Sequence, residues 1–159
     1  YQALIKALTL REGRNFQIIS DIALQVERDP GGTALVVSDR VSHCSFFEEH
    51  LKKRNIKVEL LTGQTPPEQR ANIVQSVQEG KVEVLIATLQ LISEGFDCSG
   101  LSSLFLTTPI TFEGRLLQVI GRIMRPAKNK QAIVYDYVDD TIAPLRRSAK
   151  TRLQVLSNL

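Results

Sequence analysis

The sequence contains no long apolar run, no tryptophan, one methionine and two cysteines. A membrane-spanning helix needs about 20 consecutive apolar residues, and no stretch approaches that length, so we expect no membrane partner. Cys44 and Cys98 lie too far apart in the sequence to resemble the paired spacing of a zinc site or a disulfide framework. We therefore expect a cytoplasmic protein without a metal site of its own.

A phosphate-binding loop of the form Gly-x-x-x-x-Gly-Lys-Ser/Thr is also missing. That loop cradles the β- and γ-phosphates of a nucleotide and supplies a hydroxyl ligand to Mg²⁺. Its absence predicts that this chain alone does not hydrolyse ATP.

The composition is that of a folded globular domain. Hydrophobic residues make up 43% of the 159 residues and charged residues 23%, which is enough for one domain with a real core. The net charge of +3 and the pI near 9.0 allow a polyanionic partner without demanding one. Because the chain begins at Tyr1 without Met, we expect it to be a piece of a longer protein.

Short apolar runs alternate with amphipathic stretches along the chain. Strands are predicted at 33–37, 56–61, 82–87, 103–107 and 131–138, and helices at 1–29, 42–54, 65–80, 111–126 and 141–157. This alternation indicates an α/β fold with a mainly parallel central sheet and helices on both faces. We expect residues 1–30 to form a helical entry segment and 31–159 to form the domain itself.

Local signals refine three of these elements. Thr65, Pro66 and Glu68 have the spacing of a helix start with a capping box. The acidic stretch 134–140 is interpreted as a final strand with its exit turn, in preference to a magnesium site. The basic cluster on the last predicted helix is interpreted as a solvated face; it comprises Arg146, Arg147, Lys150 and Arg152.

Hydroxyl side chains follow the predicted strands. Ser38, Thr62, Thr88 and Thr107 each stand at a strand exit, and Gly63 follows Thr62. Ligands of parallel α/β sheets bind beyond the carboxyl ends of the strands, where hydroxyls and helix N-termini suit phosphate oxygens. The alternative is that these residues are ordinary helix caps.

A stripe of polar residues marks the predicted helix 111–126. Arg115, Gln118, Arg122 and Arg125 are spaced i, i+3, i+7 and i+10, so a helix places them on one face. Gly121 beside the stripe lowers helix propensity, as expected where a ligand or backbone comes close. Two guanidiniums beside an amide can grip a polyphosphate, whereas the alternative is a solvated amphipathic helix.

Four segments, in order, resemble motifs of the second RecA-like domain of superfamily-two helicases. They are 35–44 (motif IV), Leu61-Thr62-Gly63 with Arg70, 84–88 with 94–97 (motif V), and Gln118-x-x-Gly121-Arg122-x-x-Arg125 (motif VI). The interval from Thr88 to Gly95 is longer than in DEAD-box proteins, and Gln rather than His stands at 118. The chain therefore looks closer to the DEAH-like, restriction-subunit and repair-helicase branch.

This resemblance implies roles for the motif residues at a nucleotide. Arg122 and Arg125 would reach the ATP γ-phosphate across an interdomain cleft, with Arg125 as the arginine finger. Gln118 would link the nucleotide to neighbouring motifs. Gly95 would let the backbone approach, and Asp97 would accept hydrogen bonds from the ribose hydroxyls.

Other motif residues would face nucleic acid. By the same resemblance, Ser38, Thr88 and the Thr62–Gly63 turn would touch backbone phosphates. Arg70 is interpreted instead as a member of a structural ion pair.

The resemblance also implies partners that this chain lacks. ATP and Mg²⁺ would be held mainly by an N-terminal RecA-like domain of the same parent chain, and nucleic acid, DNA rather than RNA, would be the substrate. The parent would be an ATP-hydrolysing helicase or translocase, with this domain inactive alone. A catalytically silent RecA-like binding or interaction module is the alternative.

Overall fold

The computed structural model describes residues 1–94, 96, 98–110, 121, 133–139 and 143–157. The helices of this part are α1 (Gln2–Thr9), α2 (Glu12–Arg28), α3 (Val41–Lys52), α4 (Pro67–Gln78), α5 (Leu89–Ser93) and α7 (Ala143–Ser157). The strands are β1 (Thr33–Ser38), β2 (Val58–Leu61), β3 (Val84–Thr88), β4 (Leu101–Leu106) and β5 (Ile133–Asp136).

These five strands form one sheet in the order β2-β3-β1-β4-β5, and every neighbouring pair is parallel. β1 is central: Val36 lies opposite Ile86 of β3 and Phe105 of β4. All residues of β1 and β3 are buried, as their continuous apolar runs predict for strands covered on both faces. The predicted α/β class with a parallel sheet is confirmed.

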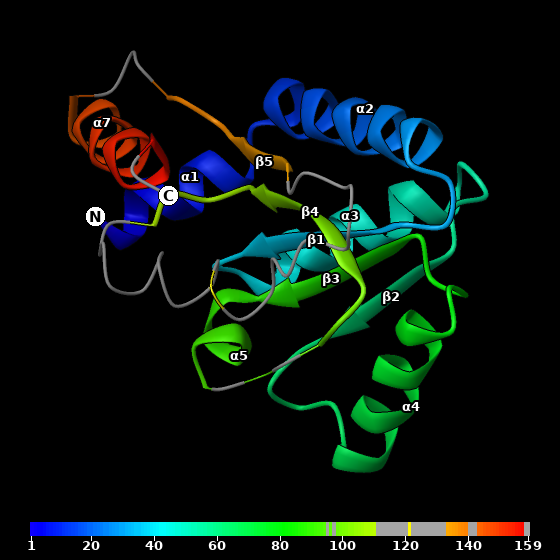
Figure 1. The fold of residues 1–159 in the computed structure, drawn as a ribbon. Helices are drawn as coiled ribbons and strands as arrows, with labels where there is room; N and C mark the ends of the chain where they lie inside the picture. The colour runs from blue at the N-terminus through cyan, green and yellow to red at the C-terminus, as the bar shows by residue number, and fades with distance from the viewer. Residues whose placement is uncertain (95, 97, 111–120, 122–132, 140–142, 158–159) are drawn as a thin grey trace.

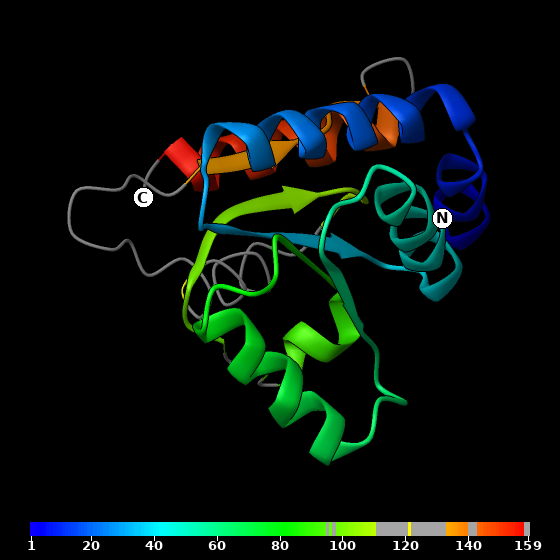
Figure 2. The ribbon, with the colours of Figure 1, turned by 90° about the vertical axis from the view of Figure 1, so that its right-hand side faces the viewer.

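Alternate residues of the strands feed two separate cores, one on each face of the sheet. Val36 packs with α2 and α3, through Ile22 and Phe47. Its neighbour Leu35 belongs to the opposite core, which includes residues of α4, α5 and α7. Two perpendicular views show α2 on one side of the sheet and α4 on the other (Figures 1 and 2). The result is a three-layer domain.

The predicted helix over 1–29 is two helices. The chain is extended at Arg11, with φ −76° and ψ 101°, so α1 ends and α2 begins there. Along α2, Ile18 is fully buried, whereas Phe16 is 42% exposed, although its position in the amphipathic pattern with Ile19 and Ile22 predicts a buried side chain. Because Ile18, Ile19 and Ile22 fill the core, α2 packs as part of the sheet domain.

One local prediction is wrong, and one short helix was missed. Thr65 does not cap α4: Pro66 is the N-cap residue without a side-chain cap bond, and the Thr65 hydroxyl accepts from the Thr62 amide at 3.0 Å. The short helix α5 was not predicted, because five residues are too few to display a helical period. Gly80 does end the α4 region as expected, with φ +73°.

The C-terminal helix α7 is anchored by a buried ion pair. Arg152, predicted to be solvated, is 1% exposed, and its Nε lies 3.0 and 2.9 Å from the two carboxylate oxygens of Asp136 on β5. Its Nη1 donates to the Ser148 hydroxyl at 2.6 Å. The other basic residues of this face, Arg146, Arg147 and Lys150, are exposed as predicted.

Among the helices of the described residues, none combines the length and apolar character that crossing a membrane requires.

Candidate functional site at the carboxyl edge of the sheet

The carboxyl ends of the three central strands are tied together. Ser38 of β1 and Thr88 of β3 are register partners. On the other side of β1, the Thr107 amide donates to the Val37 carbonyl at 3.0 Å, and the Asp39 amide donates to the Thr108 hydroxyl at 2.9 Å. The hydroxyl-bearing exits predicted from sequence therefore lie side by side at one edge.

Ser38 opens a buried relay of side-chain hydrogen bonds. Its Oγ accepts from the Arg40 amide at 3.2 Å, so its hydroxyl proton points to His43 Nδ1 at 2.7 Å. His43 then carries its proton on Nε2 and donates to Asn15 Oδ1 at 2.8 Å, while Asn15 Nδ2 donates to the Thr9 carbonyl at 2.8 Å. The relay fixes α1, α2 and α3 to the end of β1. A phosphate contact of Ser38 stays a prediction.

Burial keeps His43 neutral. It lowers the pKa of the imidazole to about 3, and the nearby Arg14 cation acts in the same direction. A neutral ring is what the relay requires, since Nδ1 must accept a proton from Ser38 while Nε2 donates. The sequence gives little indication of this relay, because the spacing of residues 15, 38 and 43 does not suggest that they are in contact.

This histidine predicts a pH-dependent stability. An unfolded histidine has a pKa of about 6.5, so below that pH the unfolded chain binds more protons than the folded one. Stability should fall as pH drops from about 6.5 toward the folded-state pKa, by up to about 1.4 kcal/mol per unit. Denaturant unfolding of wild type and His43→Gln at several pH values checks this. The variant should show the flatter profile, and parallel profiles would contradict the assignment.

Thr88 shapes the exit of β3. It is 6% exposed, and its hydroxyl accepts from the Leu91 amide at 3.4 Å, which makes it the N-cap of α5. The capping role that the sequence left open for such residues is therefore realised here. The predicted phosphate contact of Thr88 stays a prediction.

The Thr62–Gly63 turn is half-buried at Thr62 and exposed at Gly63, and a side chain of the same region supports it. The guanidinium of Arg70 donates to the Thr65 carbonyl at 2.8 Å and to the Gly63 carbonyl at 2.9 Å. The predicted ion pair of Arg70 is not found among the described residues: its guanidinium is structural, but its partners there are carbonyls. A Cβ added at Gly63 would meet no atom within 4 Å, so this glycine borders open space.

Sequence reasoning missed Arg14, which holds the exit of β4. Its Nη1 donates to the Thr107 carbonyl at 2.7 Å, and its Nε and Nη2 donate to the Asp139 carboxylate at 3.0 and 3.3 Å. With Asp136 paired to Arg152, the acid that ends β5 and Asp139 beyond it are both neutralised by arginines. This agrees with the interpretation of 134–140 as a strand and its exit turn.

The predicted nucleotide-facing residues lie outside the described residues; they are Gly95, Asp97, Gln118, Arg122 and Arg125. Gly121, within the same motif, is described: it is helical and exposed. A Cβ built there would meet nothing within 4 Å, so no described group of this chain requires a glycine at that position.

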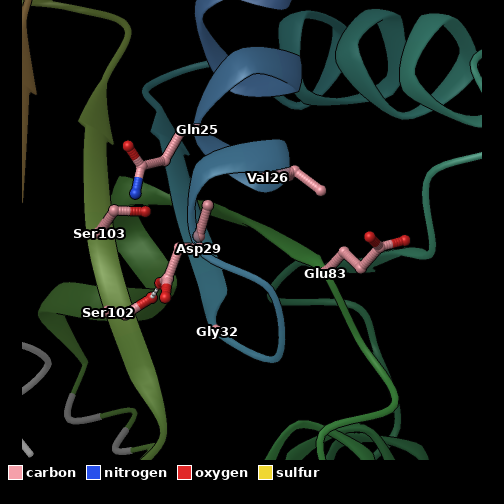
Figure 3. Close-up of a pocket in the computed structure, with 8 residues that line it drawn as sticks. Gln25, Val26, Asp29, Gly32, Glu83, Ser102 and Ser103 are labelled. Atoms are coloured by element: carbon pink, nitrogen blue, oxygen red, sulfur yellow. Dashed lines mark hydrogen bonds between the residues drawn. The ribbon is translucent and has the colours of Figure 1, made fainter.

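The opposite, amino edge of the sheet is closely packed. Ser102 of β4 lies beside Asp29 and donates to its Oδ2 at 2.6 Å (Figure 3). A Cβ on Gly32 would lie 2.0 Å from that carboxylate, so a larger residue there would have to displace the Asp29 side chain. The depression between these residues has no room for a water molecule.

A family model for the helicase conserved C-terminal domain matches residues 14–127. Among curated proteins, a putative helicase 22 of Sulfolobus islandicus filamentous virus is 30% identical over 131 residues, 82% of this chain and 22% of that protein. The ATP-dependent DNA helicase uvsW of Enterobacteria phage T4 is 29% identical over 155 residues, 96% of this chain and 30% of that protein. The chain thus spans less than a third of these relatives.

Solved structures share the fold. T4 UvsW superposes with a TM-score of 0.78 at 24% identity, covering 99% of this chain and 35% of that one. Domain 2 of the DEAD-box helicase Mss116p, solved with an RNA duplex, gives 0.67 at 21% identity, covering 85% and 53%. The five-stranded parallel sheet with helices on both faces is therefore the RecA-like architecture of these domains.

Proposed function

Because the chain belongs to the family of helicase conserved C-terminal domains, we propose that it is the C-terminal motor domain of an ATP-dependent helicase or translocase acting on DNA. The observation that carries the proposal is the convergence of the Ser38, Thr88 and Thr107 exits at one edge of the sheet. The family match runs through residue 127 and so includes the predicted arginines Arg122 and Arg125.

The strand-binding surface would be the exits of β1, β2 and β3. The Thr62–Gly63 turn is the exposed part, held in shape by Arg70, and can present its backbone and hydroxyl to phosphate oxygens. Ser38 and Thr88 are buried with hydroxyls engaged inside the protein. We infer that Ser38 and Thr88 mainly position the loops that follow them, and that a phosphate binds at the surface which these loops form.

The nucleotide side would be served by residues after β3 and β4. Arg122 and Arg125 would place cations beside the transferred phosphoryl group, Gln118 would connect them to the strand-binding side, and Gly95 and Asp97 would contact the nucleotide. Cations fixed where charge develops stabilise the transition state. ATP and Mg²⁺ would be held mainly by a separate domain that carries a phosphate-binding loop. This chain alone would not turn over ATP.

The preference for DNA is supported by one kind of observation. The T4 relative, matched over 96% of this chain, is described as an ATP-dependent DNA helicase. The RNA-bound Mss116p domain is only 21% identical to this chain, so the similarity supports the fold and not the choice of nucleic acid. We therefore propose single-stranded DNA as the strand that crosses this edge.

Strand binding by this chain alone should be weak, independent of base sequence and sensitive to salt. This domain alone would form only one wall of the two-domain binding cleft, so it offers few phosphate contacts. Each contact releases condensed counterions, so the affinity falls as the salt concentration rises. Fluorescence anisotropy of a labelled single strand, titrated at two salt concentrations, measures this. Affinity that ignores salt, or that changes with base order, would contradict the proposed surface, as would the absence of binding at the lower salt.

A further inference from the structure

A hollow of about 210 Å³ opens between the first turns of α2 and α3. Six of its lining residues are Thr9, Glu12, Asn15, Ser42, His43 and Phe46. It lies at the carboxyl edge, because Asn15 is hydrogen-bonded to His43 and His43 to Ser38 at the end of β1. A water takes about 30 Å³ in the liquid, so the hollow has room for a small ring system.

One wall of this α2–α3 hollow is a supported aromatic ring. The Phe46 ring lies 5.7 Å from Phe16, 6.0 Å from Phe47 and 4.3 Å from His50, centroid to centroid. His43 in turn packs on Phe47 at 4.3 Å. A ring braced on several sides loses little freedom when a ligand stacks on it, which favours binding.

Among the described residues that line the hollow, one side chain is ionised. It is the carboxylate of Glu12, because burial holds the imidazole of His43 in the neutral form. A carboxylate repels a free anion, so the hollow is better suited to a neutral group.

Unused hydrogen-bonding groups line the hollow beside the aromatic wall. Ser42 is exposed and offers its hydroxyl to a ligand. The exposed carboxylate of Glu12 adds an acceptor. An apolar side chain of another protein segment would leave these groups without partners, whereas a planar heteroaromatic ring can stack on Phe46 and meet them with its edge.

We propose that the α2–α3 hollow takes one unpaired base of the single strand, stacked on Phe46, an inference that rests on the proposed function. Any base can stack on this ring, because each base has a π-face. The site is therefore compatible with sequence-independent binding. It would also select unpaired strands, since a base within a duplex is not free to enter.

The test compares Phe46→Leu, which removes the ring, with Phe46→Tyr, which keeps it, in anisotropy titrations of a labelled single strand. A strand of equal length without bases serves as the second ligand. Phe46→Leu should bind the normal strand about 5-fold to 100-fold more weakly than wild type and bind the abasic strand equally well. Phe46→Tyr should stay close to wild type. Leu24→Ala removes an exposed apolar side chain elsewhere on α2 and should change neither titration.

A fluorescent base analogue, 2-aminopurine, reports stacking directly: its emission should be quenched on binding to wild type and less so on binding to Phe46→Leu. Equal affinity of Phe46→Leu and wild type for the normal strand would overturn the inference and leave the proposed function standing. An equal loss on the abasic strand would also overturn it, because the ring would then act through folding. Failure of wild type to bind either strand would remove the proposed function itself.

Discussion

Replacing Arg125 with alanine in a full-length protein that joins this domain to a phosphate-binding-loop domain should lower the ATPase kcat by about 100-fold or more. Nucleotide is expected to be held mainly by the other domain, so ATP affinity should change by less than about tenfold, or about 1.4 kcal/mol. The missing cation matters most where charge develops, which confines the loss to the transition state. Strand unwinding should be abolished.

Two further variants make this result specific. Arg125→Lys should not restore the rate, because a flexible ammonium does not reproduce the planar fork of a guanidinium. Arg146→Ala on α7 removes an exposed arginine and should leave kcat unchanged. Steady-state kinetics with a separate nucleotide titration give both quantities, and a near-wild-type kcat in Arg125→Ala would exclude this residue from the reaction.

The second large effect concerns stability. Arg152→Ala should destabilise the fold by about 3 kcal/mol, because it leaves the carboxylate of Asp136, whose side chain is only 15% exposed, without its partner. Folded domains are stable by only about 5–15 kcal/mol, so the loss is a large fraction of the total. Urea unfolding followed by circular dichroism measures it. Arg147→Ala, which removes an exposed arginine of the same helix, is the matched control and should change stability little.

The pH dependence of that loss tests its cause. Burial raises the pKa of the Asp136 carboxyl, and the Arg152 guanidinium opposes this rise. Without Arg152 the folded-state pKa should move further above the unfolded one. Such a carboxyl favours the fold below its unfolded pKa, and that contribution is lost as pH rises through the folded pKa. The loss of unfolding free energy in Arg152→Ala, relative to wild type, should therefore be smaller at about pH 5 than at about pH 8. An equal loss at both would argue for packing alone.

Sequence patterns predicted the fold where burial is strong on both sides. β1 and β3 read as continuous apolar runs because each lies inside the sheet with helices on both faces. β5, at the edge, is less clearly patterned, and it ends at Asp136, two residues before the predicted end at 138. α5 was not predicted, because the one feature of the sequence that marks this short helix is its N-cap residue, Thr88.

The candidate site was predictable only in part, since tertiary contacts decide the roles of individual side chains. A hydroxyl at a strand exit is visible in the sequence, but nothing there shows that Ser38 is buried against His43. Arg14 and Arg152 look like surface cations until the folded chain brings Asp139 and Asp136 to them. Likewise, the α2–α3 hollow is lined by residues that precede β1 in the sequence and by residues that follow it, and no local pattern connects the two groups.

The central claim is that this domain supplies the transition-state cation to a nucleotide held by its partner domain. Titration of the full-length protein with ADP and aluminium fluoride, which together mimic the transferred phosphoryl group, tests it most directly. We predict that wild type binds this mimic much more tightly than ADP, whereas Arg125→Ala binds the two about equally while retaining its affinity for ADP. Equal tightening in wild type and Arg125→Ala would contradict the account.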